Sequence, residues 1–400
     1  MQIIIGAGKT GQSCANYFAR HFMPYKLLDT RTLTDEEKTL LKNTKEIILS
    51  PGIDPALFPN YKIISDIELF AREAKAPIIG ITGTNAKGTV TTLVTDMINA
   101  CGKTALMGGN IGIPALDLLT EPTPDFYVLE ISSFQLEITD YLPCIASTIL
   151  NISPDHLDRH KTMANYIAAK QRIYRDSKNC IYNLDDVNTT PGRGMASPLQ
   201  KNIIDFGLKD LNLLPIEELK IKGKHNYLNA LAALKIGEAI GLDFKKMLDA
   251  LKKFPGLEHR CEWVTTQNNI TWINDSKGTN IGATIAALEG FGSDHKNIIL
   301  IAGGLGKDAD FSLLKPSIDK FVREIILFGK DAPLIFNAIQ RGTTVDTLKN
   351  SILKAQELAQ SGDIILLSPA CASWDMFKDF EDRGRQFKAL VKEYITHEVI

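Results

Sequence analysis

Residues 77–102 read PIIGITGTNAKGTVTTLVTDMINACG and follow the order strand, turn, helix. The apolar run at 77–82 predicts a buried parallel strand, and the apolar spacing from 90 to 98 predicts a helix that ends at Gly102. Between them lies the turn 83–89, which carries glycines, a lysine and hydroxyl residues. Such a turn directs backbone N–H groups and a positive charge at anionic oxygens, which predicts a phosphate site.

This turn departs from the common phosphate-binding string in two places. Ala86 replaces the glycine expected before Lys87, and Gly88 stands where a hydroxyl residue is expected, so the hydroxyl falls to Thr89. An ordinary strand-to-helix turn of a doubly wound sheet, with no ligand, is the alternative. Under the phosphate hypothesis, the N–H of Ala86 keeps the site usable if the turn needs no positive φ there.

A second glycine turn opens the chain. A strand is expected at 2–5, then GAGKTG at 6–11, then a helix to Arg20 and a strand at 26–28 that ends at Asp29. G-x-G-x-x-G with an acid about 20 positions on is typical of a dinucleotide-binding fold. Arg31 suits a phosphate instead, and the next motif begins too soon for a six-stranded NAD domain. We therefore expect a small nucleotide-phosphate domain, with close strand–helix packing alone as the alternative.

The rest of the chain alternates strands and helices, which is typical of mainly parallel sheets. Further strands are expected at 46–49, 125–131, 146–150, 261–267, 270–274, 297–302, 324–328 and 363–367. Further helices are expected at 66–74, 163–174, 226–240, 244–254, 334–340, 347–360 and from 381. The predicted fold class is α/β with three consecutive α/β domains, at 1–70, 71–256 and 257–400. The outer two are expected to be Rossmann-like, and the central one to bind a mononucleotide through its P-loop.

A metal site is expected beside the turn 83–89. Glu130 ends the strand 125–131, and a carboxylate at the carboxyl end of a parallel strand is well placed to hold Mg²⁺. His156 and His160 have a zinc-like spacing, but they lie in a turn-rich stretch without the glutamate of H-E-x-x-H, which favours one histidine on magnesium or phosphate. Lys170, between apolar helix positions, either forms a solvated ion pair or faces this metal site.

Composition excludes several classes of protein. The net charge of −2 gives no electrostatic reason to expect nucleic acid or an anionic membrane as a partner. Residues 1–11 lack the basic lead of a signal peptide, and no apolar run approaches the ~18 residues of a membrane span. The six cysteines are scattered without a C-x-x-C pair, which fits a reducing compartment. We expect a cytoplasmic protein.

Several strings, taken together and in order over nearly the whole chain, resemble the Mur ligases of peptidoglycan synthesis. They are G-T-N-x-K (83–87), E-I-S-S-F-Q-L-E (130–137), N-I-S-P-D-H-L-D-R (151–159), A-A-K-x-R-I-Y (168–174), H-N-Y-x-N-A-L-A-A (225–233), H-R (259–260) and N-D-S-K-x-T-N (274–280). Three more are similar to the members that add D-glutamate: D-T-R (29–31), D-I-E-L-F (66–70) and S-P-A-C-A-S-x-D-x-F-x-x-F (368–380).

The resemblance implies an ATP-dependent ligase that joins D-glutamate to UDP-N-acetylmuramoyl-L-alanine through an acyl phosphate. This reaction belongs to cytoplasmic cell-wall precursor synthesis and so serves cell shape and division. The implied cofactors are ATP and Mg²⁺, with two ions expected, and the implied partners are these small molecules alone. A monomer is expected, without nucleic acid or membrane. The three domains would close about a hinge near Pro255–Gly256.

Site residues follow by motif match. The implied ATP contacts are Gly83, Thr84, Asn85, Lys87, Gly88, Thr89, Asn226, Asn229, Arg260, Asp275 and Lys277. The implied contacts of the UDP-linked substrate are Lys9, Thr10, Asp29, Thr30, Arg31, Gly52, Asn110 and Ser132. The implied D-glutamate contacts are Thr279, Lys307, Ser373 and Phe380. The implied metal ligands are Thr89, Glu130, His156 and Lys170, where Lys170 matches a lysine that is carbamylated in the family. The implied catalytic group consists of Lys87, Glu130, His156 and Lys170.

Three alternatives remain open from the sequence. The chain could be another amide ligase of the Mur and folylpolyglutamate synthase superfamily. It could be an NAD-dependent oxidoreductase, which rests on 6–11 and Asp29 and leaves the turn at Lys87 unexplained. It could be a binding-only homologue without activity, because of Ala86 and Gly88.

Overall fold

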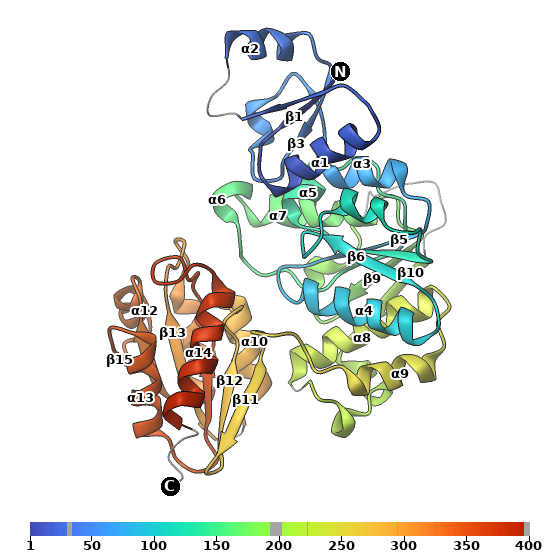
Figure 1. Cartoon of the computed structure of the whole chain (residues 1–400). Helices are drawn as coiled ribbons and strands as arrows, with labels where there is room; N and C mark the ends of the chain where they lie inside the picture. Colours follow the sequence, from blue (N-terminus) through green and yellow to red (C-terminus); the bar gives the residue numbers. More distant parts are fainter. Residues whose placement is uncertain (30–33, 193–201, 222, 294, 396–400) are drawn as a thin grey trace. The chain divides into compact units, whose positions relative to one another are not determined.

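The computed structural model describes residues 1–29, 34–192, 202–221, 223–293 and 295–395 (Figure 1). Thr30 and Arg31, two of the implied substrate contacts, lie outside these ranges. The chain separates into two compact units, Met1–Glu217 with Leu228–Lys253 and Glu218–Tyr227 with Phe254–Ile400. The chain passes between the units after Glu217, after Tyr227 inside α8 (Lys224–Ala239), and after Lys253. The first unit holds two sheets and the second holds one.

The first sheet has four parallel strands in the order β2-β1-β3-β4. Its strands are β1 (Gln2–Ile5), β2 (Tyr25–Leu28), β3 (Glu46–Leu49) and β4 (Lys62–Ile64). The helices of this part are α1 (Lys9–Arg20), α2 (Asp35–Lys42) and α3 (Asp66–Glu73). Four strands agree with the expectation that this part is too short for a six-stranded NAD domain. β4 was not predicted, because its three residues give too short an apolar signal.

The second sheet has six parallel strands in the order β10-β9-β8-β5-β7-β6. Its strands are β5 (Ile78–Thr82), β6 (Ala105–Gly109), β7 (Phe126–Glu130), β8 (Cys144–Ile149), β9 (Asn179–Asn183) and β10 (Asn202–Phe206). The α-helices of this part are α4 (Lys87–Ala100), α5 (Ser133–Glu137), α6 (Leu157–His160), α7 (Met163–Gln171), α8 and α9 (Phe244–Lys253). The helix expected at 163–174 ends as α7, and residues Arg172–Tyr174 form a 3₁₀ turn.

The three glycines of residues 108–112 predict a flexible turn, but for Gly108 and Gly109 this prediction is wrong because both belong to β6. The two glycines interrupt the apolar pattern that would predict a strand. Close packing requires glycine at both positions, because it leaves no room for a Cβ. A Cβ on Gly108 would lie 2.4 Å from the Ile113 carbonyl oxygen, and one on Gly109 would lie 2.5 Å from that of Glu130.

One apolar core joins both sheets of the first unit. It contains Ile4 of β1, Phe18 of α1 and Phe70 of α3 together with Tyr127 of β7. The rings of Phe70 and Tyr127 pack edge to face with centroids 5.0 Å apart. Figure 1 shows α1 and α3 between the two sheets. This shared core fixes the two sheets of the first unit against each other.

The second unit is a doubly wound α/β sheet in the order β11-β12-β16-β13-β14-β15, parallel except for β11. Its strands are β11 (Glu262–Gln267), β12 (Ile270–Asn274), β13 (Ile298–Gly303), β14 (Val322–Phe328), β15 (Thr343–Thr344) and β16 (Ile364–Leu367). Its helices are α10 (Ile281–Phe291), α11 (Lys315–Phe321), α12 (Ala332–Ile339), α13 (Leu348–Leu358) and α14 (Phe380–Ile395). α10, α11 and α12 pack on the face of Leu300 and Leu366, while α13 and α14 pack on the face of Ile301 and Ile365.

The α/β fold class is thereby confirmed, with mainly parallel sheets in both units. None of the helices in the described part of the chain is long and apolar enough to cross a membrane.

Candidate active site

The turn between β5 and α4 forms with strain at one residue. Ala86 is the N-cap of α4 and has a φ of 65°, in the left-handed region. This conformation suits glycine and costs a residue with a Cβ about 1 kcal/mol. The condition set from the sequence, that Ala86 needs no positive φ, is therefore not met. The turn nevertheless leads into α4 at Lys87, and the N-terminus of a helix directs backbone N–H groups toward an anion.

The segment after β8 holds this turn in place. Asn151 accepts a hydrogen bond from the backbone N–H of Asn85 at 2.8 Å through its side chain, and one from that of Thr84 at 2.9 Å through its carbonyl. The Thr84 hydroxyl lies 3.0 Å from the Tyr166 hydroxyl and accepts from the Ser153 N–H at 3.0 Å. Thr84 therefore uses its hydroxyl to fix the turn. The sequence did not single out Asn151 or Tyr166, although each belongs to or adjoins a quoted motif.

Two lysines converge on the Gly83 carbonyl. Lys87 Nζ donates to it at 3.0 Å and to the Thr84 carbonyl at 3.0 Å, and Lys170 Nζ donates to it at 2.8 Å. Lys170 is buried, and its Nζ lies 4.8 Å from the centre of the Tyr166 ring. Burial holds the pKa of Lys170 well below its usual value, and the Lys87 charge adds to this shift. The positive charge at the start of α4, where a polyphosphate would lie, therefore comes from Lys87, while burial favours the neutral amine of Lys170.

The two carboxylate oxygens of Glu130 differ, because one accepts a hydrogen bond and the other has no hydrogen-bond partner among the described residues. It is buried at the end of β7, and its Oε1 accepts a hydrogen bond from Asn110 Nδ2 at 2.7 Å. Its Oε2 is buried without a hydrogen-bond partner among the described residues. A buried carboxylate oxygen without a partner is costly, and a bound divalent cation would satisfy it. This oxygen is the observation that fits Glu130 to a magnesium ion.

The two histidines of the zinc-like spacing have different surroundings. His156 has a φ of 54°, its side chain is 43% exposed, and its ring lies 4.9 Å from that of Phe134. His160 is buried, its Nε2 lies 3.0 Å from the Ser133 hydroxyl, and burial lowers its pKa to about 4. Over the part of the chain that the structure describes, no group of three His, Cys, Asp or Glu side chains is arranged to hold a metal ion. A magnesium site here would combine Glu130 and His156 with Thr89, Lys170 and substrate oxygens.

The β1–α1 turn brings together several implied contacts of the UDP-linked substrate. Gly6 has a φ of 102°, and a Cβ on Gly11 would lie 1.8 Å from the Gly6 carbonyl oxygen, so this turn requires glycine at both positions. Lys9 and Thr10 begin α1, and Lys9 Nζ donates to the Gly112 carbonyl at 2.6 Å. This contact links the first turn of α1 to the loop of Asn110.

The remaining implied substrate contacts lie at the ends of neighbouring elements. Asp29 follows β2, and Gly52 is exposed in the loop after β3. Ser132 is the N-cap of α5, and its hydroxyl accepts from the Gln135 N–H at 3.2 Å. The Ser50 hydroxyl next to Gly52 donates to the Gly6 carbonyl at 3.0 Å, which ties this loop to the glycine turn.

Arg159, for which the sequence predicted no role, connects the loop after β3 to the segment that carries His156 and His160. Its Nη2 donates to the Ile53 carbonyl and to Glu137, each at 3.1 Å, and its guanidinium lies 5.1 Å from the centre of the Phe134 ring. Phe134 packs in turn against His156. Arg159 belongs to α6 and lies three residues after His156. Its role follows only from its partners, which are distant in the sequence.

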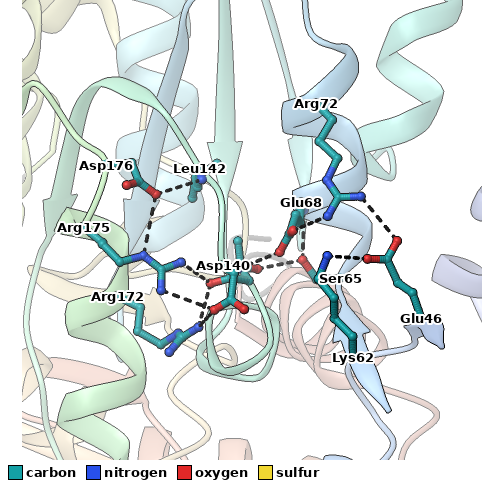
Figure 2. Close-up of polar contacts among 11 residues, drawn as sticks. Glu46, Lys62, Ser65, Glu68, Arg72, Asp140, Leu142, Arg172, Arg175 and Asp176 are labelled. Carbon is teal, nitrogen blue, oxygen red and sulfur yellow. Dashed lines mark hydrogen bonds and ion pairs between the residues drawn. The ribbon is translucent and has the colours of Figure 1, made fainter. Parts of the chain in front are cut away.

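A polar junction also ties α3 to the central part of the first unit, as Figure 2 shows. Glu68 is buried and accepts from Arg72 Nη2 and from the Asp140 N–H, each at 2.6 Å. Asp140 accepts in turn from Arg172 at 2.6 Å and from Arg175 at 3.3 Å. We name these five residues the α3 junction. It adds directional contacts to the shared apolar core.

Other implied nucleotide contacts lie in α8 and in the second unit. Asn226 and Asn229 are buried in α8, and Arg260 precedes β11. Asp275 is buried after β12, where its carboxylate accepts from the Ser368 hydroxyl at 2.7 Å and the Cys261 N–H at 3.2 Å, and burial raises its pKa to about 6. That these residues and Lys277 contact the same nucleotide as Lys87 stays a prediction.

The implied D-glutamate contacts lie on three turns at the carboxyl edge of the second unit's sheet and at the start of α14. Thr279 follows β12, Lys307 follows β13 and Ser373 follows β16, while Phe380 begins α14. Lys277 Nζ lies 3.6 Å from the centre of the Phe380 ring, and Lys307 Nζ lies 5.3 Å from that of Trp374. Trp374 is 66% exposed and was not among the expected contacts.

Comparison with known proteins gives consistent matches. The model of the Mur ligase middle domain matches residues 81–215, and that of the Mur ligase glutamate ligase domain matches residues 259–371. The UDP-N-acetylmuramoylalanine–D-glutamate ligase of Pseudomonas aeruginosa is 45% identical over 98% of this chain and 98% of its own. The enzyme of the same name from Nitrosococcus oceani is 42% identical over 98% and 97% of the two chains.

Solved structures agree at the level of the fold. The MurF ligase from Thermotoga maritima in complex with ADP has a TM-score of 0.60 at 14% identity and covers 88% of this chain and 96% of its own. At that identity the likeness supports the fold alone. The two family models cover the turn at Lys87 and the turns that carry Thr279 and Lys307.

Proposed function

Because the chain belongs to the Mur ligase family, we propose that it joins D-glutamate to the L-alanyl carboxylate of UDP-N-acetylmuramoyl-L-alanine with ATP as the energy source. The chain is an ATP-dependent amino-acid ligase of peptidoglycan synthesis. The observation that carries the choice of D-glutamate is the 45% identity, over 98% of both chains, to an enzyme of that name.

The proposed reaction proceeds in two steps. The L-alanyl carboxylate attacks the γ-phosphate of ATP, which releases ADP and leaves an acyl phosphate. The amine of D-glutamate then attacks the acyl carbon, phosphate departs with the bonding pair, the amine loses a proton, and an amide remains. Lys87 and the N–H groups of its turn hold the phosphates, so the protein contributes positioning and charge rather than a nucleophile.

Magnesium binding is part of the proposal. Glu130 would offer its unpartnered Oε2, with His156 and the Thr89 hydroxyl as further ligands of one or two ions. Bound Mg²⁺ supplies neutralisation of the negative charge that collects on the transferred phosphoryl group.

Lys170 would enter this site as a carbamate. Its burial favours the neutral amine, which is the form that adds CO₂ with loss of a proton and becomes an anionic oxygen ligand. ¹³C-labelled bicarbonate should give a carbamate resonance that Lys170→Met lacks. A spectrum identical for the two proteins would remove this part of the proposal.

Domain organisation and setting complete the proposal. We place three domains at 1–70, 71–256 and 257–400 in a cytoplasmic monomer that closes about Pro255–Gly256. In support, Gly256 has a φ of 85°, and it lies between α9 and β11 close to the division of the two units. Sedimentation of the purified chain tests the monomer.

The decisive experiment measures phosphate release from ATP with the UDP-linked substrate and each candidate amino acid. Release with D-glutamate but not L-glutamate is expected. Lys87→Ala should abolish release because it removes the charge at the turn, whereas Lys103→Ala, an exposed residue just after α4, should not. Release with a different amino acid would indicate another ligase of the superfamily. No release despite substrate binding would indicate the inactive homologue, and NADH binding would indicate the oxidoreductase.

A further inference from the structure

Arg383 of α14 is a buried cation without an ion-pair partner among the described residues. Its side chain has no exposed surface. Its Nε donates to the Ser276 hydroxyl at 3.0 Å, and its Nη2 donates to the carbonyls of Ser276 at 2.8 Å and Cys371 at 3.1 Å. Nη1 has no hydrogen-bond partner among the residues that the structure describes, and none of their carboxylates forms an ion pair with the guanidinium.

A buried guanidinium without an ion-pair partner requires a structural or functional explanation. Burial lowers the pKa of Arg383 to about 10, so the guanidinium still carries its charge near pH 7. A buried charge without a counter-ion is strongly unfavourable, and proteins keep one where it serves a ligand or a fixed architecture. The unpartnered Nη1 indicates that the binding capacity of this side chain is incompletely used within the described chain.

The contacts of Arg383 span three turns at the carboxyl edge of the sheet. Ser276 lies in the turn after β12 and Cys371 in the turn after β16. The third turn, after β13, approaches at Gly304, where a Cβ would lie 3.3 Å from Nη1. These are the turns that carry Thr279, Ser373 and Lys307.

Two further contacts close the arrangement. The Ser276 hydroxyl, which accepts from Arg383, donates to the Phe380 carbonyl at 2.8 Å. Leu305 and Ala372 exchange backbone hydrogen bonds of 2.9 Å in both directions, which joins the turns after β13 and β16. All four proposed D-glutamate contacts are therefore on segments that Arg383 reaches directly or through one residue.

We propose that Arg383 is a positioning residue for the anionic amino-acid substrate, which sets the spacing of the three turns and places a buried positive charge beneath the bound carboxylates. This inference rests on the proposed function, since it assumes an acidic amino acid at these turns. The turns cover the guanidinium, so Arg383 acts through Thr279, Lys307 and Ser373 and is not a catalytic residue.

One internal alternative is specific enough to test. The buried Oδ1 of Asp375 also has no partner among the described residues, and the charge of Asp375 acts on Arg383 more strongly than that of Asp275. A small movement could pair the two groups and make Arg383 purely structural. Asp375→Asn keeps the shape and removes the charge, and therefore separates the two explanations.

The experiment compares steady-state kinetics of the full chain carrying Arg383→Lys, Arg383→Met, Asp375→Asn and, as a matched control, Arg385→Met. Arg385 lies two residues on in α14, with its side chain 60% exposed. We expect the KM for D-glutamate to rise about tenfold in Arg383→Lys and about 100-fold in Arg383→Met, the range for lost charge-assisted hydrogen bonds. The KM for the UDP-linked substrate should stay within about twofold, because that substrate is proposed to bind in the first unit, and the lysine should rescue part of the loss.

Several results would overturn the proposal. It fails if Arg383→Met folds and keeps the wild-type KM for D-glutamate, or if Arg383→Lys raises the KM of both substrates equally. It also fails if Asp375→Asn raises the KM for D-glutamate as much as Arg383→Met does. Should Arg383→Met not fold, Arg383→Lys alone decides. If the wild-type chain releases no phosphate with any amino acid, the proposed function fails instead, and the loss of a D-glutamate-induced thermal shift in Arg383→Lys then judges Arg383.

Discussion

The backbone conformation of one residue, Ala86, introduces strain into the turn between β5 and α4. Ala86 holds a φ of 65° at the N-cap of α4, where the absence of a Cβ would relieve strain. We expect Ala86→Gly to raise the free energy of unfolding by about 1 kcal/mol, since glycine adopts this region without the steric cost. Ala250→Gly, in the interior of α9, should lower it by about 1 kcal/mol because glycine is a poor helix former. Urea unfolding measures both, and the same sign for both variants would contradict the left-handed Ala86.

A second residue-scale effect concerns pH. Asp66 is buried in the first turn of α3, accepts from Gln135 Nε2 at 3.2 Å, and has a pKa raised by burial from 3.8 to about 6. The unfolded chain releases this proton first as the pH rises, so the stabilisation present below pH 3.8 is lost as the pH passes through 6. Asp66→Asn lacks this loss. Relative to wild type, the variant should gain about 3 kcal/mol of unfolding free energy from about pH 4 to about pH 7. An unchanged difference across that interval would show that the pKa is not raised.

At the scale of elements, the segment after β8 acts as the support of the phosphate turn. Asn151 makes three hydrogen bonds to Thr84 and Asn85, two of them through its side chain. Asn151→Ala should leave the turn free to rearrange and raise the KM for ATP about tenfold, the loss expected for one or two buried hydrogen bonds. Asn165→Ala, which removes a contact to the His160 carbonyl outside this turn, is the matched control. Equal KM values for ATP in wild type and Asn151→Ala would rule out this support.

The elements that the sequence predicted well are those with a strong local signal. β5, the turn and α4 were predicted from apolar spacing and glycine, and Glu130 from its place at the end of an apolar strand. β6 and β4 were missed, because two glycines and a three-residue length remove that signal, and β9, β10 and β15 were not predicted either. Arg159, Tyr166 and Arg383 could not be predicted, because their partners lie on distant segments that only the folded chain brings close.

At the scale of the whole molecule, the α3 junction adds to the apolar core in holding the two sheets of the first unit together. Glu68 is 2% exposed and accepts two hydrogen bonds. Glu68→Ala would leave the Asp140 N–H and Arg72 without that partner, and we expect a loss of about 2 kcal/mol of unfolding free energy, reduced from the value for a fully buried pair because Arg72 is partly exposed.

Lys62→Ala provides the comparison, because it removes an exposed ion pair with Glu46 and should cost under about 1 kcal/mol. Scanning calorimetry measures both variants. A cost for Glu68→Ala no larger than for Lys62→Ala would show that the apolar core alone holds the sheets.

The position of Trp374 allows binding near Lys307 to be followed by tryptophan fluorescence. The chain contains three tryptophans, of which Trp272 is fully buried while Trp374 lies exposed beside Lys307. Indole emission responds to the local electric field, and a dicarboxylate at this turn would change the field that the ammonium group imposes on the ring. The unlabelled chain therefore carries its own fluorescent reporter for the amino-acid site, whose signal Trp374→Phe would remove while the emission of the buried Trp272 and of the exposed Trp263 in β11 persists.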